Sequence, residues 1–230
     1  MYRERPSSIL GAIAWTAPSD GTAVRVLPDG CMDLLWYGDR LMVAGPDTAA
    51  FLSVAPAGVT VAGLRFAPGS GPGVLGLPAH AARDQRVALG EVWDPATVRR
   101  LEEEVAAAAS PARALERIAA RHGRCDPVVD PLLAEVVRRT ARDEAIGAIA
   151  HAVGLSPRQL HRRSLDAFGY GPKLLARVLR LQRALVRARE GAGLATVAAE
   201  HGYADQAHLA RDVRDLAGTT LGGLGVGRAA

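Results

Sequence analysis

SPRQLHRRSLDAFG spans residues 156–169 and DQAHLARDVRDLAG spans residues 205–218, so two similar stretches lie 49 positions apart. Each begins with a residue that caps helices, Ser156 or Asp205, and each ends at a glycine. A leucine follows each cap by four residues, and an arginine, Arg162 or Arg211, comes two residues later. This spacing predicts two helices that bury the leucine and leave the arginine in solvent.

A shorter helix is predicted before each of these stretches. Ala150 and Ala198 are small enough to let one helix approach another, and Gly154 and Gly202, four residues later, suit a sharp turn with positive φ. Pro157 fills the first helical position of the first copy. The pattern predicts a helix-turn-helix, whose second helix presents its early residues to the major groove. A plain helical hairpin shares these features once, but two copies at matching offsets favour the DNA-binding unit.

The segment between the two copies predicts a long connecting helix over Pro172–Glu190, with an apolar stripe and arginines on its other faces. Some 18 helical residues span ~27 Å, a little less than the ~34 Å of one turn of B-DNA. Residues 156–189 carry nine basic groups against one acid, Asp166. Such a concentration of charge is typical of a protein that binds a polyanion, with nucleic acid as the first candidate. A solvated helix face is the alternative.

The first 70 residues are predicted to form an antiparallel barrel or sandwich-like unit, because short apolar runs alternate with turn formers such as Pro-Asp-Gly. After Gly71 the composition becomes helical, with helices predicted from Asp94 to Ala108 and over Pro111–His122. The fold class is therefore α+β, with a linker at Gly123–Pro127. The predicted strands are Ile9–Thr16, Ala23–Leu27, Cys31–Tyr37, Arg40–Ala44, Phe51–Val54 and Val59–Phe66.

Several motifs together resemble the AraC/XylS family of bacterial transcription regulators. They are GLSPRQLHRR at 154–163, GYGPK at 169–173, RVLRLQRAL at 177–185 and GYADQAHLAR at 202–211, and the resemblance covers residues 127–224. The front half, with LPDGCMDLLW at 27–36 and VAGPDT at 43–48, is similar to a poorly characterised domain often found before this unit.

The resemblance implies which side chains face DNA. It puts base-facing positions at Arg158, His161 and Arg162 in the first recognition helix. In the second it puts them at Gln206, Ala207, His208 and Arg211. We expect the caps and the neighbouring polar or basic side chains to complete the interface; these are Ser156, Gln159, Arg163, Lys173, Arg177 and Asp205.

Two other sequence features are compatible with a cofactor site or a metal site, but a structural or incidental role is favoured for both. GPGVLG at 71–76 fits a dinucleotide-binding pattern, yet Pro78 interrupts the helix such a site needs, so no cofactor is expected. His122 and Cys125 lack a second ligand pair, so no metal site is expected. A small-molecule effector site in the front half is a candidate, with strand-core or turn roles as the alternative; its residues are Asp29, Cys31, Asp33, Trp36 and Arg65.

The sequence as a whole predicts a cytoplasmic, sequence-specific DNA-binding regulator and not an enzyme. Residues 1–125 are expected to form a sensory or oligomerisation domain, and residues 126–230 two helix-turn-helix units that bind double-stranded DNA. Contact with RNA polymerase, an unknown effector and a homodimer stay open as partners, and no membrane association is expected, since no long apolar run occurs. The alternative is a small-molecule-binding or modifying enzyme that uses the helical half as a scaffold.

Overall fold

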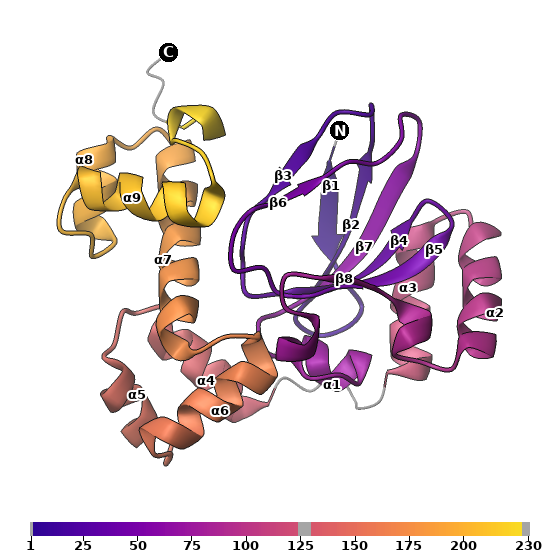
Figure 1. Ribbon diagram of the computed structural model, residues 1–230, viewed down its shortest axis with the longest axis horizontal. Coiled ribbons are helices and arrows are strands. Elements are labelled where there is room, and N and C mark those ends of the chain that lie inside the picture. Colours follow the sequence, from indigo (N-terminus) through magenta and orange to yellow (C-terminus); the bar gives the residue numbers. More distant parts are fainter. Residues whose placement is uncertain (1, 124–129, 227–230) are drawn as a thin grey trace.

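The computed structural model describes residues 2–123 and 130–226, which form a sheet unit and a helical unit lying side by side (Figure 1). The predicted linker at Gly123–Pro127 and the predicted division at 125/126 fall almost entirely outside the described residues. None of the helices in the described ranges is long and apolar enough to cross a membrane.

The sheet unit is built on one six-stranded antiparallel sheet in the order β1-β2-β7-β4-β5-β8, with a separate ribbon of β3 and β6. The sheet is open and not closed into a barrel, because β1 and β8 are unpaired edges within it. The six predicted strands are confirmed, Arg40–Ala44 with the predicted ends and the other five with shifted ends, and two strands were missed. The strands are β1 Arg3–Pro6, β2 Ala12–Pro18, β3 Val24–Val26, β4 Met32–Tyr37, β5 Arg40–Ala44, β6 Phe51–Ser53, β7 Thr60–Phe66 and β8 Arg86–Ala88.

Alternation along the strands gives the large sheet two different faces. Leu34 and Leu64 lie opposite each other on β4 and β7, are fully buried, and pack with Leu115 and Ile118 of α3. The helices α2 (Pro95–Ala106) and α3 (Pro111–His122) confirm the two predicted ones, and α1 (Gly71–Leu75) covers the end of this core (Figure 1). Within residues 2–123 and 130–226, the opposite face of the sheet is not covered by a helix and lies beneath the β3–β6 ribbon.

The glycine-rich stretch at 71–76 forms α1 rather than a phosphate-binding loop. Pro72 lies in its first turn, and Gly76 ends it in the left-handed conformation at φ 79°. A Cβ on Gly71 would lie 2.7 Å from the Cβ of Met32, so this glycine is needed for close approach to β4. The stretch therefore serves helix–sheet contact.

The helical unit repeats one helix-turn-helix twice, as the sequence predicts. In the first copy α5 (Ile146–Ala152) and α6 (Pro157–Phe168) flank Gly154, and in the second α8 (Leu194–Glu200) and α9 (Gln206–Ala217) flank Gly202. The two glycines have φ of 67° and 69°. The connecting helix α7 (Pro172–Arg189) holds the copies at its two ends, and α4 (Pro131–Thr140) and the short turn η3 (Gly222–Leu224) complete the unit (Figure 1).

The two units meet along α7 and at the carboxyl ends of α6 and α9. Gly169, just after α6, lies so near the sheet unit that an added Cβ would be 2.5 Å from Pro46, and Arg83 donates to its carbonyl at 3.4 Å. At α9, Arg25 of the ribbon donates to the Ala217 carbonyl at 2.8 Å. The amino-terminal turns of both helices are left exposed.

Candidate nucleic-acid interface and effector cavity

The start of α6 is fixed by a reciprocal pair of hydrogen bonds. The backbone N–H of Gln159 donates to the Ser156 hydroxyl at 3.3 Å, and the Ser156 N–H donates to Oε1 of Gln159 at 2.8 Å. This capping box satisfies two backbone donors that a helix start leaves free. Gln159, predicted to face DNA, therefore has its side-chain oxygen committed to its own helix.

The start of α9 uses a different cap. Asp205 accepts from the N–H of His208 at 2.6 Å, and Nδ1 of His208 accepts from the N–H of Ala204 at 3.3 Å. The ring of His208 also meets the ring of Tyr203 edge-on, with centroids 5.1 Å apart. His208, predicted to read bases, is thus held back against its own turn, although Nε2 is not part of that hydrogen bond.

Arginines project from the exposed faces of both α6 and α9. Arg158 and Arg162 of α6 are exposed and have no side-chain hydrogen bond or ion pair within the described ranges. On α9, Arg211 is exposed and bonds only the Ala207 carbonyl of its own helix, at 3.3 Å. Arg214 lies three residues further on, is exposed, and was not predicted; the i, i+3 spacing from Arg211 is the signal that points to it.

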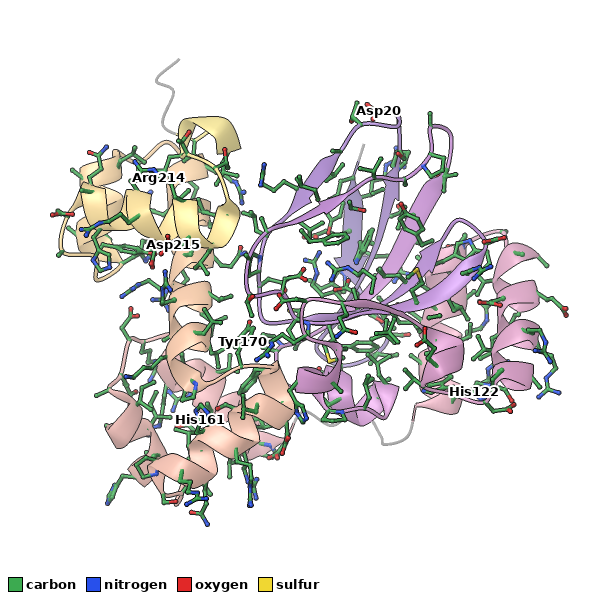
Figure 2. All side chains as sticks on the ribbon, viewed as in Figure 1. Asp20, His122, His161, Tyr170, Arg214 and Asp215 are labelled. Carbon is green, nitrogen blue, oxygen red and sulfur yellow. The ribbon has the colours of Figure 1, made fainter. Side chains whose placement is uncertain are left out.

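Figure 2 shows His161 on α6 and Arg214 on α9 towards opposite ends of α7. The ring of His161 lies over Gly171, where an added Cβ would be 2.7 Å from Cε1. Gln206 and Ala207 occupy the exposed first turn of α9. The predicted base-facing residues therefore lie in the amino-terminal halves of α6 and α9. All of them are exposed except His208, which is half-buried.

The arginines of α7 have a different position from the one predicted. Arg177 donates to Asp212 at 2.7 and 3.0 Å and to Asp215 at 2.9 Å, and Arg180 donates to Asp212 at 3.3 Å. The guanidinium of Arg180 also stacks over the Tyr203 ring at 4.5 Å. Arg177 therefore links α7 to α9 and does not face outward as a DNA-contacting residue, so its predicted role is wrong.

The turn after α4 and the end of α8 also supply acids to α7. Arg183 pairs with Asp143 at 2.6 Å, and Arg187 pairs with Glu200 at 3.1 Å. The charge excess of residues 156–189 is thus balanced in part by acids from elsewhere in the chain. Of the remaining predicted basic residues, Arg163 lies 4.0 Å from Asp130, whereas Lys173 is exposed without an ion pair among residues 2–123 and 130–226.

Comparisons with known proteins agree with this geometry. The model of a helix-turn-helix domain matches residues 149–224, which run from α5 through η3. The helical half is an AraC-type helix-turn-helix domain. A domain of unknown function (DUF6597) matches residues 12–88, which hold β2 to β8 in front of the AraC-type domain. The AraC-type domain supports a DNA-binding transcription regulator.

Solved structures resemble the whole chain, with the AraC-type domain behind a sheet unit. ToxT from Vibrio cholerae strain SCE256, crystallised with an unsaturated fatty acid bound, has a TM-score of 0.50 at 10% identity, covering 95% of this chain and 97% of that chain. ToxT from Vibrio cholerae O395 has a TM-score of 0.46 at 8% identity, covering 91% and 94%. Identities this low concern the fold alone. No curated protein sequence matches the chain.

The sheet unit, which precedes the AraC-type domain in the chain, contains a cavity of about 560 Å³, and the face of the sheet opposite α2 and α3 forms its floor. The β3–β6 ribbon forms one wall, because Val24, Val26, Phe51 and Ser53 all face inward and line the cavity. Val24 is 60% exposed, so apolar surface inside the cavity is left uncovered. The outward face of the ribbon carries Arg25, which bonds α9.

A cluster of charged side chains occupies one corner of this cavity. Nε of Arg65 lies 3.4 Å from Asp29 and 3.8 Å from Asp33, and Asp33 accepts from the indole N–H of Trp15 at 2.7 Å. Burial raises the pKa of Asp33 to about 6, although Arg65 pulls that pKa down. Trp15 lies flat across Gly63, where an added Cβ would be 2.2 Å from the ring.

Of the five predicted effector-site residues, four line the cavity and one does not. Asp29, Cys31, Asp33 and Arg65 are among its walls. Trp36 is buried on the other face of β4, in the core with the helices, because its side chain alternates with those of Asp33 and Leu35. We therefore drop Trp36 from the candidate site. Burial raises the pKa of the Cys31 thiol well above its usual range, which disfavours the thiolate.

The structure offers no support for a metal site at His122 and Cys125. Cys125 lies outside the described residues, and His122 stacks near Trp93 with ring centroids 6.2 Å apart. In the part of the chain that the structure describes, no group of three or more His, Cys, Asp or Glu side chains is arranged to hold a metal ion.

Proposed function

We propose that the protein binds double-stranded DNA sequence-specifically and reads two successive major-groove segments, one with α6 and one with α9. The observation that carries the proposal is the equivalence of Arg162 and Arg211. They occupy the same position in two copies of one unit, both are exposed, and neither has an ion pair in the described ranges. An arginine fork can donate two hydrogen bonds to O6 and N7 of guanine.

The length of α7 supports reading on one face of the duplex. Its 18 residues span ~27 Å, and a modest bend of the DNA makes up the difference from one helical turn. The ion pairs of Arg177 and Arg180 with Asp212 hold α9 against this rod. The spacing of the two recognition helices is thus built into the helical unit.

We infer that residues 1–125 sense an effector and that residues 126–230 bind DNA, in the cytoplasm of a bacterium. The cavity and the helices share one segment of chain, which supports this coupling. Asp29 lines the cavity, the neighbouring Pro28 carbonyl accepts from Gln182 of α7 at 2.6 Å, and Gly30 lies beside Leu175 of the same helix. A molecule that moves the loop at residues 28–30 would act directly on α7, the helix that connects the two recognition helices. RNA polymerase and a second copy of the chain stay open as further partners.

Tyr170 is a second link between the two units. It lies two residues after the end of α6, is 2% exposed, and its buried hydroxyl has no hydrogen-bond partner in the described ranges. Figure 2 shows Tyr170 where the helical unit meets the sheet unit. Burial raises the pKa of Tyr170, and Asp29 is the charged group that adds most to that rise. The segment that follows α6 is thus electrostatically coupled to Asp29 of the cavity wall, which supports communication between the cavity and the first helix-turn-helix.

We expect Arg162→Ala and Arg211→Ala each to weaken binding to the selected DNA site by ~1–3 kcal/mol and to relax base preference at separate positions. The site is first obtained by selecting bound fragments from random DNA, and affinity is then measured by mobility shift with the full chain. Arg99→Ala, on the exposed face of α2, is the matched control and should change nothing. Unchanged affinity and footprint in both recognition-helix variants would show that α6 and α9 do not read DNA.

Lys173→Ala should behave differently, because an ammonium on the first turn of α7 is placed to contact phosphate rather than a base edge. Binding should weaken about equally on all sequences, and the slope of log affinity against log salt should flatten by ~1. The measurement is affinity at several salt concentrations on the selected site and on random DNA. A loss confined to the selected site would instead make Lys173 a base-reading residue.

A further inference from the structure

The cavity under the β3–β6 ribbon carries chemistry that the DNA-binding proposal does not use. We propose that it binds a small organic cation, an amine on an apolar or aromatic body, rather than an organic acid. This inference rests on the proposed function in one respect, the role of the cavity as an effector site, and it concerns the chemical class of the effector.

The charge balance inside the cavity favours a cation. The lining holds four aspartates, Asp20, Asp29, Asp33 and Asp47, but only two arginines, Arg65 and Arg86, so carboxylates outnumber guanidinium groups. Arg86 donates to both oxygens of Asp47 at 2.7 and 2.9 Å, and Arg65 lies between Asp29 and Asp33. An organic acid that reached Arg65 would come close to both of these carboxylates. An ammonium group there would meet two carboxylates that share one guanidinium.

Asp33 is the carboxylate that an incoming cation would stabilise most. Its side chain is only 15% exposed, Arg65 stands off at 3.8 Å, and the indole N–H of Trp15 is its one short hydrogen bond among the described residues. A buried carboxylate with incomplete pairing is costly in a folded protein, and a cation beside it recovers part of that cost. The cavity therefore contains a carboxylate, Asp33, that is incompletely paired within the protein and that a cationic ligand would pair.

The aromatic lining fits the same class of ligand. Trp15, Tyr2, Tyr37 and Phe51 all line the cavity, and Tyr2 and Trp15 stack with ring centroids 6.0 Å apart. Aromatic faces attract cations, most strongly for Trp. Phe51 already holds the guanidinium of Arg86 at 4.0 Å from its ring centre, so the cavity shows this contact within the protein itself. The apolar side chains of Val24, Val26 and Leu35 would cover the body of the ligand.

The test compares three probes that share one phenyl body: 2-phenylethylamine, 2-phenylethanol and 3-phenylpropanoate. Each is titrated calorimetrically into the full chain without DNA at pH 7.5. We expect the amine to bind at least about tenfold more tightly than the alcohol, and the carboxylate to bind most weakly. The carboxylate binding most tightly, all three binding equally, or none binding would each overturn the proposal.

Variants separate the charge from the shape of the cavity. Asp33→Asn should bring the affinity for the amine to within about threefold of that for the alcohol, and Asp29→Asn should reduce the same preference. Asp39→Asn removes an equal charge from the turn between β4 and β5, where the Asp39 side chain is 92% exposed. This variant should keep the preference for the amine. A preference for the amine that survives both cavity variants contradicts the proposal.

The result stands apart from the test of DNA binding. Amine binding without any selected DNA site would overturn the regulator and keep the ligand class. A selected site read by Arg162 and Arg211, in a protein that prefers the carboxylate, would overturn the ligand class and keep the regulator.

Discussion

Replacing Asp212 with alanine is expected to lower the free energy of unfolding by about 3 kcal/mol, which is among the largest effects we expect of any single change in this chain. Asp212 is 4% exposed and accepts hydrogen bonds from both Arg177 and Arg180. Its removal leaves two partly buried guanidinium groups facing each other without the carboxylate between them. The figure is at the low end for a broken buried pair, since Arg177 is 38% exposed.

Asp215 provides the matched control for this change. It lies on the same helix and pairs with the same Arg177, at 2.9 Å, but its side chain is 64% exposed. Asp215→Ala should therefore cost less than about 1 kcal/mol. Urea unfolding followed by circular dichroism measures both variants. Equal costs for the two would mean that burial of Asp212 does not hold α9 on α7.

Replacing Asp33 with asparagine is expected to have the opposite sign and to stabilise the protein at neutral and alkaline pH. Burial raises the pKa of Asp33 to about 6, from 3.8 for an ordinary aspartate, so the folded protein holds this proton more tightly than the unfolded chain. The resulting penalty is absent below about pH 4, grows up to about pH 6, and is complete above it. A difference of about two pKa units corresponds to about 3 kcal/mol.

Asp33→Asn removes that penalty, so its stabilising effect should rise from about 1 kcal/mol at pH 4.5 to about 3 kcal/mol at pH 8. The groups that face Asp33 are Arg65, Asp29, Trp15, Arg86 and Cys31, and all are unchanged in the variant. Urea unfolding at the two pH values is the measurement, with Asp39→Asn as the exposed control. If Asp33→Asn is less stable than the parent protein at pH 8, Asp33 is a structural ion-pair partner and not a site kept ready for a ligand.

The effect expected at Asp33 connects stability with the inferred function. A carboxylate that costs stability when ionised is a candidate for binding another molecule that makes use of the charge. The same substitution that stabilises the empty protein should thus abolish its preference for an amine. Asp212 is the reverse case, because its charge is used entirely inside the fold.

Most of the helical unit was predictable because its signals are local. Ser156 and Asp205 cap helices through hydrogen bonds that reach only three residues, and the turn glycines act through their own φ angles. The role of Gln159 in the capping box was equally local, yet the sequence analysis placed it among the DNA-facing side chains. The two missed strands have weak local signals, since β1 is the charged edge RERP and β8 is three residues long.

By itself the sequence determined the two helix-turn-helix units, the rod between them and the exposed arginines at Arg162 and Arg211, because caps, glycines and apolar periodicity act over a few residues. Only the tertiary structure decided which charges are free. Asp212 neutralises Arg177 from 35 positions away, and Asp33 meets Arg65 across neighbouring strands, so a count of charge along the chain cannot give the charge at a point in space. The pairing of distant strands also placed Trp36 in the core and Asp33 in the cavity.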